Sequence, residues 1–321
     1  MNKNISIILA PFSIGGPNDA AKDGPKALLS NYIDDDLKEL GFNVKIIKPP
    51  FNVPAKRQAR NTTKNNRIKN IESIVLINEW LAKVVASEVK KGNLPLTIGG
   101  DHSLAIGTIA GTVDALKDIG VFWIDRHFDA HSPKNTPSWR AHGMPVAVAV
   151  ADKNYDKHPD FLRLLNIGQS KKFPKVKPAN FVQVGIGEKS AVNPKTKWYS
   201  MEDIDNKGIS KIVNEALNYL LKRVKYIYIA WDIDSMNITG TGTSGDGQLT
   251  LREGLIIARA IDKRIWLSGR LAGFEIMEVA PKLERKDSKG QTVDWAIQLV
   301  TTCFGGNLFN NLSRLKRNIH V

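Results

Sequence analysis

Four short clusters of this chain, at 99–102, 125–129, 232–234 and 274–278, carry acidic and histidine side chains of the kind that bind divalent metal ions. Glu278 ends the fourth cluster, and the first three include His102, Asp125, His127, Asp129, Asp232 and Asp234. Two imidazoles and four carboxylates, with no cysteine among them, favour hard divalent ions over a structural zinc site. Manganese suits this set, and cobalt, nickel or zinc can compete for it. Two such ions can share a water, lower its pKa and deliver hydroxide at neutral pH, so a metallohydrolase is the leading hypothesis.

Each cluster also has an ordinary structural interpretation when it is taken alone. An aspartate after a strand is often a helix cap or a turn residue, and Asp101, just before His102, has such a position. The whole set is harder to explain in that way. Four aspartates buried near one another would repel and lose their hydration, whereas two divalent ions would cancel the charge. We therefore expect one shared site for two divalent ions.

The clusters follow segments with the composition of buried β-strands. The pattern predicts strands at 5–9, 43–47, 94–98, 121–125, 181–186, 226–231 and 271–277. It predicts helices at 25–41, 71–90, 104–116, 209–223, 252–262 and 292–303. This alternation predicts a single α/β domain over residues 1–321, with a mostly parallel sheet and helices on both faces. Ligands of such sheets bind beyond the carboxyl ends of the strands, where His102, Asp125 and Asp232 are expected.

Composition is that of an ordinary globular protein. The 321 residues include one cysteine, Cys303, which excludes an internal disulfide and fits a reducing cytoplasm. The apolar run within residues 1–10 is too short for a signal peptide, and no stretch is long enough to span a bilayer. The net charge of +14 is compatible with nucleic-acid binding, but the densest basic run, 56–69, has no aromatic residue to stack on bases. We expect a cytoplasmic protein without a nucleic-acid or membrane partner.

Longer motifs around the clusters resemble the ureohydrolase family, and its arginase branch in particular. Gly-Gly-Asp-His-Ser-Leu-Ala-Ile-Gly (99–107), Trp-Ile-Asp-Arg-His-Phe-Asp (123–129) and Trp-Asp-Ile-Asp-Ser (231–235) are similar to its three signatures. Ala-His-Gly-Met-Pro (141–145) and residues 247–254 are also arginase-like. The resemblance covers nearly the whole chain. It implies an arginase-like fold, two manganese ions per subunit, and a homotrimer or homohexamer.

The resemblance also implies a reaction and roles for particular residues. Metal-bridged hydroxide would attack the guanidinium carbon of L-arginine and give urea and L-ornithine. The six residues above match the metal ligands, with Asp129 also catalytic. His142 matches a loop histidine that carries protons, and Glu278 matches a glutamate that pairs with the guanidinium. The residues implied in binding the rest of the substrate are His131, Thr136, Ser138, Glu188, Ser190 and Thr243.

Some residues depart from the arginase pattern. Arg126 and Phe128 lie between metal ligands where small residues are common, and Glu275 stands where an aspartate is typical. His131 and Arg140 each replace an asparagine. These changes leave the six ligand positions complete. We therefore expect the metal chemistry to be retained.

The stretch from 184 to 193 departs in a way that affects the substrate. Arginases place acids there that bind the α-amino group, and Glu188 keeps one of them. Ser190 and Asn193 replace the others, which predicts weaker binding of arginine. The alternative function is therefore another ureohydrolase, acting on agmatine, a guanidino acid or formiminoglutamate. A non-catalytic protein that binds metal or ligand on the same scaffold is a further alternative.

Overall fold

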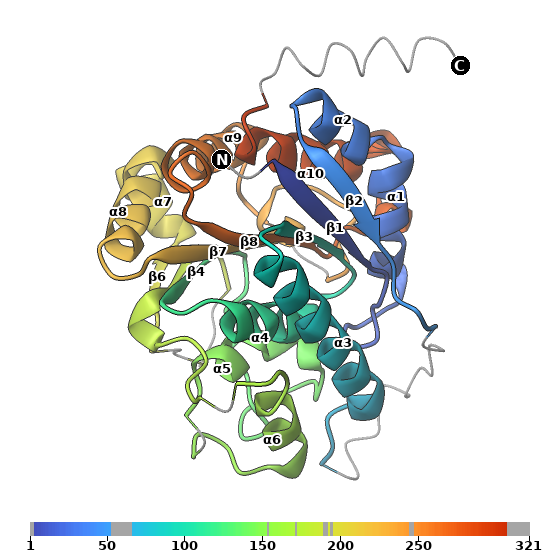
Figure 1. Ribbon diagram of the computed structural model, residues 1–321, viewed down its shortest axis with the longest axis vertical. Coiled ribbons are helices and arrows are strands. Elements are labelled where there is room, and N and C mark those ends of the chain that lie inside the picture. The colour runs from blue at the N-terminus through green and yellow to red at the C-terminus, as the bar shows by residue number, and fades with distance from the viewer. Residues whose placement is uncertain are drawn as a thin grey trace.

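A single parallel sheet forms the centre of the protein, as expected. The computed structural model describes residues 3–52, 66–152, 154–170, 172–188, 192, 195–243 and 247–306. The strands are β1 Asn4–Ala10, β2 Asn43–Ile47, β3 Leu94–Gly99, β4 Ile119–Ile124, β5 Phe181–Ile186, β6 Lys197–Ser200, β7 Tyr226–Asp232 and β8 Leu271–Met277. All eight are parallel, in the order β2-β1-β3-β8-β7-β4-β5-β6 (Figure 1). Every residue of β3, β4 and β5 is buried, because helices cover both faces of the sheet.

The helices cover the two faces in blocks along the chain. They are α1 Gly24–Ser30, α2 Ile33–Glu39, α3 Ile71–Lys90, α4 Ala105–Ala115, α5 Pro145–Val150, α6 Pro159–Leu165, α7 Met201–Lys207, α8 Ile209–Leu221, α9 Leu251–Ile261 and α10 Gln291–Cys303. Figure 1 shows α3, α4, α5 and α6 on one side of the sheet and α1, α2, α9 and α10 on the other. Within the described residues, no helix is both long and apolar enough to cross a membrane.

Close packing of α3 against α4 positions the segment that carries His102. A Cβ atom on Gly107 would lie 2.5 Å from the backbone oxygen of Asn78, so only glycine permits this approach. The Asn78 side chain also accepts a hydrogen bond from the Gly107 N–H at 2.7 Å. Helix α4 follows directly after the short 3-10 helix His102–Leu104. The contact between the helices therefore anchors the turn that presents His102.

The helix predicted over 25–41 is wrong in one respect, because two helices occupy this segment. α1 ends at Ser30, α2 begins at Ile33, and Tyr32 between them has a φ of 65°. Leu28 and Ile33 are both fully buried, although residues five positions apart lie on different faces of a straight helix. The break at Tyr32 brings both side chains to the sheet.

The pattern also predicts no strand at β6 and no helix at α7. β6 is a four-residue edge strand in which Tyr199 alone is buried, so it lacks a hydrophobic period. Helix α7 begins with a capping box formed by Ser200 and Asp203. That pair is a recognisable sequence signal for a helix start. The prediction therefore missed α7 by neglecting its cap.

Candidate active site

The carboxyl ends of four neighbouring strands meet at the centre of one edge of the sheet. Strands β3, β8, β7 and β4 are adjacent in this order. His102 follows β3, and Asp125 follows β4. Asp232 is the last residue of β7, and Glu278 follows β8. Because the strands are parallel, residues far apart in sequence are brought together at a ligand-binding edge.

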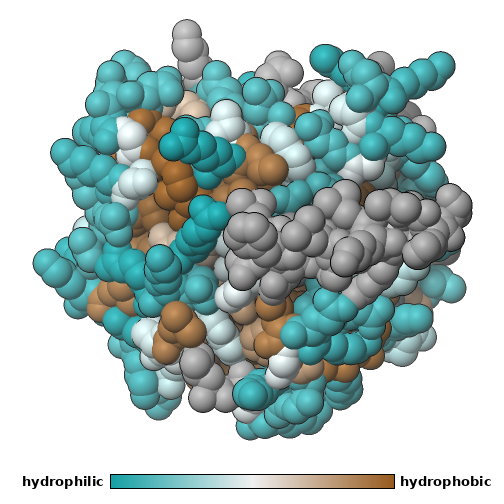
Figure 2. Space-filling view, turned by 90° about the horizontal axis from the view of Figure 1, so that it is seen from above, coloured by the Kyte–Doolittle hydropathy of each residue, from teal (hydrophilic) through white to brown (hydrophobic). Residues whose placement is uncertain are grey.

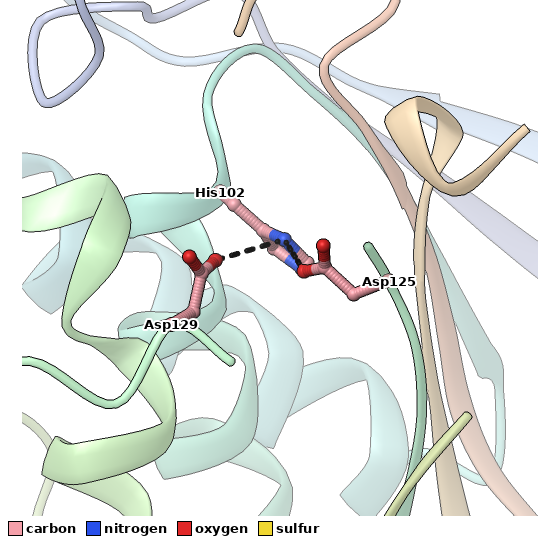
Figure 3. A group of neighbouring side chains, drawn as sticks. All are labelled: His102, Asp125 and Asp129. Carbon is pink, nitrogen blue, oxygen red and sulfur yellow. Dashed lines mark ion pairs between the residues drawn. The ribbon is translucent and has the colours of Figure 1, made fainter. Parts of the chain in front are cut away.

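His102 lies among three carboxylates. Its Nδ1 lies 3.0 Å from Oδ2 of Asp232, 3.1 Å from Oδ2 of Asp125 and 3.4 Å from Oδ2 of Asp129. Figure 3 shows Asp125 and Asp129 on either side of the ring. The buried imidazole stacks on the Trp123 indole, with ring centroids 4.0 Å apart. Strand β4 therefore fixes the plane of the ring while Nδ1 faces the acids.

A second group of potential ligands overlaps the first at Asp125. The Nδ1 atom of His127 lies 3.0 Å from Oδ2 of Asp234 and 3.6 Å from Oδ1 of Asp125. Asp125 thus faces one histidine with each of its oxygens. The groups His102, Asp125, Asp129 and Asp125, His127, Asp234 each have ligand atoms within 4.8 Å of one another. Two ions that share one carboxylate fit this arrangement.

Hydrogen bonds orient the carboxylates. The Trp123 indole donates to Oδ2 of Asp125 at 2.8 Å, and the backbone N–H of His127 donates to Oδ1 at 2.6 Å. At the end of β7, the N–H of Asp234 donates to Oδ1 of Asp232 at 2.8 Å. The acids are therefore held in place by groups of their own strand ends.

The protonation of the cluster shows how much negative charge is gathered there. Burial and the charge of Asp125 raise the pKa of Asp129 well above its usual range. Burial and the charge of Asp234 do the same to the pKa of Asp232. Burial lowers the pKa of His102, but Asp125 and Asp232 outweigh it and raise that pKa. Without cations, protons would neutralise the cluster, and divalent ions would replace those protons.

The contacts also fit metal ligands better than hydrogen bonds. Among the described residues, neither ring nitrogen of His102 has a hydrogen-bond partner, nor has Oδ1 of Asp234, although these atoms are buried. The contacts of His102 Nδ1 are therefore close but not aligned as hydrogen bonds. Two ligands about 2.1 Å from one ion and at right angles lie about 3.0 Å apart. The nearest contacts of Nδ1 are of that length, so the residues present fit divalent ions.

His142 lies at the side of the cluster, in the short 3-10 helix Ala141–Gly143. Its backbone N–H donates to the carbonyl of Gly15 at 3.2 Å, and its side chain is half-buried. Burial, followed by the positive charges of His127 and Arg140, lowers the pKa of His142 to about 3. The imidazole is therefore neutral at pH 7.

Glu278 has a φ of 64°, an uncommon conformation for a residue with a side chain. Its Oε1 accepts a hydrogen bond from the N–H of His102 at 2.9 Å. Its Oε2 is buried and has no hydrogen-bond partner in the described part of the chain, and Gly242 leaves the space for it. Burial and the charges of Asp232 and Asp101 raise the pKa of Glu278. A planar cation would fit the unpaired oxygen and keep the group ionised.

One group of residues predicted to contact the substrate lies in the loop before His142. The Thr136 hydroxyl accepts a hydrogen bond from the N–H of Trp139 at 3.0 Å. The Ser138 hydroxyl accepts one from the N–H of Arg140 at 3.2 Å. Both side chains are partly exposed, so they shape the loop and still reach its surface.

The other predicted contacts have different surroundings. The N–H of His131 donates to Gly143 at 2.9 Å, and its Nδ1 is buried without a hydrogen-bond partner among the described residues. Oε1 of Glu188 accepts a hydrogen bond at 2.7 Å from the backbone N–H of Phe128, which lies between two predicted metal ligands. The Thr243 hydroxyl donates to a predicted ligand carboxylate and so supports the cluster. Ser190 and Asn193 lie outside the described residues.

Sequence reasoning missed the support that Trp123 gives to the cluster. Alternation along β4 was an available signal, because Trp123 and Asp125 point to the same face.

Asp101 does cap the following helix, as expected of an aspartate after a strand, since its side chain accepts a hydrogen bond from the Ser103 N–H at 2.9 Å. Arg126 has Nε and Nη1 buried without a hydrogen-bond partner in the described ranges, and nothing described there explains this residue.

The chain is similar to known proteins over nearly its whole length. A model of the arginase family matches residues 3–305. Arginase-1 of Rattus norvegicus is 36% identical over 317 residues, which cover 94% of this chain and 93% of that protein. The structure of arginase from Bacillus caldovelox has a TM-score of 0.82 at 29% identity and covers 95% of this chain and 99% of its own. Entamoeba histolytica arginase, solved in complex with L-ornithine, has a TM-score of 0.79 at 26% identity, with coverages of 95% and 99%.

Proposed function

Because this chain belongs to the arginase family and is a ureohydrolase acting on C–N bonds, we propose that it hydrolyses L-arginine to urea and L-ornithine. We further propose that it does so with two manganese ions per subunit. The observation that carries the proposal is the pair of overlapping ligand groups that share Asp125. The unpaired oxygen of Glu278, on a carboxylate bonded to the backbone of His102, supports it.

Different residues of the site would have different roles in this reaction. When bound by the two ligand groups that share Asp125, divalent ions would lower the pKa of water and supply hydroxide near neutral pH. Glu278 would hold the guanidinium through Oε2, since a carboxylate and a planar cation form strong charge-assisted bonds. His142 matches the loop histidine of the family and is neutral at pH 7, and we propose that it passes the proton released by the attacking water to the leaving amine.

The amino-acid end of the substrate depends on other residues. The Entamoeba histolytica arginase was solved with L-ornithine, which supports an amino-acid substrate here. We propose that Glu188 receives the α-ammonium group and that Thr136 and Ser138 receive the carboxylate. Ser190 and Asn193 are uncharged, which favours a second candidate, a guanidino acid without an α-amino group. We therefore expect the Michaelis constant for L-arginine to be higher than in arginases that keep acids at these two positions, with the rate of the chemical step retained.

A panel of guanidino substrates separates the candidates. Urea release would be measured with added manganese for L-arginine, agmatine and a guanidino acid that lacks the α-amino group. We expect the highest kcat/KM for L-arginine. Strong turnover of the guanidino acid, with L-arginine barely used, would replace the first candidate by the second. Absence of urea from every substrate would refute a ureohydrolase acting on these compounds.

We also propose a homotrimer or homohexamer that acts in the cytoplasm without a nucleic-acid or membrane partner. Figure 2 shows a hydrophobic patch bordered by hydrophilic residues on the face seen from above. Exposed patches of this kind are typical of surfaces that subunits bury. The single, buried Cys303 suits a reducing compartment. Light scattering tests the assembly, and a monomer at working concentration would contradict it.

A further inference from the structure

Glu275 is a buried carboxylate that lies behind the metal-ligand cluster. It belongs to β8 and is fully inaccessible to solvent. Its Oε2 accepts hydrogen bonds from the Thr108 hydroxyl at 2.6 Å and from the Tyr228 hydroxyl at 2.8 Å. Burial and the charge of Glu275 raise the pKa of the Tyr228 phenol, which therefore remains a donor. Because Thr108 lies in α4 and Tyr228 in β7, three elements hold this carboxylate.

The second oxygen of Glu275 faces His102. Glu275 Oε1 lies 3.8 Å from His102 Nε2, and both atoms are buried without a hydrogen-bond partner among the described residues. Unpaired buried polar atoms are costly, and here an acceptor and a potential donor face each other. An N–H to O hydrogen bond is about 2.9 Å long, so a shift of about 0.9 Å would join them.

We propose that Glu275 is a positioning residue that accepts the Nε2–H of His102 and thereby presents Nδ1 to the metal. This inference rests on the metal centre proposed above. A histidine ligand binds through one nitrogen, and a hydrogen bond at the other fixes its tautomer and its orientation. His102 has Nδ1 on the side of the aspartates and Nε2 on the side of Glu275, as this role requires. Thr108 and Tyr228 hold the acceptor in place.

Manganese titration of the full-length chain tests the proposal. Calorimetry, with ion counting after dialysis, is expected to give two ions for the wild type. Glu275→Leu removes the acceptor. It should lower the affinity for the ion beside His102 about 100-fold and leave the affinity for the ion beside His127 unchanged. Glu275→Gln keeps the size of the side chain but has one acceptor oxygen, for which Thr108 and Tyr228 compete with His102, so the affinity for the same ion should fall by about 10-fold to 100-fold.

Glu88→Gln is the matched control. Glu88 is a second buried carboxylate with several hydrogen bonds, and it lies near the end of α3, away from the cluster. Its variant should unfold at a lower temperature and bind both ions as the wild type does.

The outcomes separate the possible explanations. If Glu275 only supports the core, its variants will resemble Glu88→Gln, with unchanged affinity for both ions, and the inference is wrong. If Glu275→Leu does not fold, the near-isosteric Glu275→Gln decides by the same criterion. A wild-type chain that binds no manganese would instead refute the metal centre itself.

Discussion

Asp125 presents one oxygen to each of two histidines, so its removal should affect both ions at once. We predict that Asp125→Asn loses both manganese ions and nearly all urea release. Asp129→Asn should mainly weaken the ion beside His102, since Asp129 belongs to only one ligand group. Ion counts after dialysis measure the difference. Two retained ions in Asp125→Asn would show that this carboxylate is not shared.

His142 provides a second prediction for a single residue, because it lies outside the ligand groups. His142→Ala should keep both ions and lose turnover by roughly 10²–10⁴-fold, the usual contribution of a general acid or base. Since the pKa of His142 is lowered to about 3, its own protonation should not reduce activity between pH 5 and 8. Turnover across this range, measured with the metal content, checks both statements. Lost metal, or unchanged turnover, would contradict the role.

The candidate site shows what a sequence can reveal about single residues. Alternating acids and histidines after strands indicated which side chains share a face, and the structure brings the four aspartates and two histidines together. The contact of Glu275 with His102 could not be predicted in the same way. It depends on β8 lying next to β3 in the sheet, and residue spacing does not encode strand order. For the same reason, the sequence predicted a parallel sheet but not the order of its strands.

Among the elements, the edge strand β2 and helix α3 are joined through Glu88. This buried carboxylate accepts hydrogen bonds from Ser6, Lys91 and Asn93, and it lies 3.6 Å from the ammonium group of Lys45. Although burial alone raises the pKa of Glu88, hydrogen bonds from Lys91, Asn93 and Ser6 outweigh it and lower that pKa to about 2. The ionised form is therefore the one that stabilises the fold.

The lowered pKa of Glu88 determines how its contribution to stability depends on pH. A carboxyl whose pKa is lowered on folding stabilises the protein above its unfolded pKa, and this stability is lost as pH falls through the folded value. We predict that Glu88→Gln reduces the free energy of unfolding by about 1–3 kcal/mol at pH 7. The difference should shrink as pH falls from about 4.5 toward 2. Denaturant unfolding at several pH values measures it, and a difference independent of pH would exclude the charge as its cause.

The helix boundaries show which features the sequence pattern predicts and which depend on tertiary packing. The long apolar period of α3 predicted its bounds correctly. The break between α1 and α2 was missed because it depends on Leu28 and Ile33 both reaching the sheet. That requirement comes from packing, which overrides the local preference for one continuous helix.

For the whole molecule, metal binding and folding should be linked. Burial and neighbouring acids raise the pKa values of Asp129 and Asp232, so their charged forms destabilise the metal-free fold as pH rises above the unfolded value of about 3.9. Manganese would cancel this charge. We predict that the increase in unfolding temperature on adding manganese grows between pH 5 and 8. At 100 times the dissociation constant, one ion adds about 2.7 kcal/mol. Scanning calorimetry with manganese or a chelator checks this, and an equal increase at every pH would contradict it.

Urea release from L-arginine, followed as manganese is added to the metal-free chain, tests the central claim most directly. The overlapping ligand groups predict negligible activity without metal and a maximum at two ions per chain. Full activity in the presence of a strong chelator, or a maximum reached with one ion per chain or fewer, would contradict a binuclear ureohydrolase.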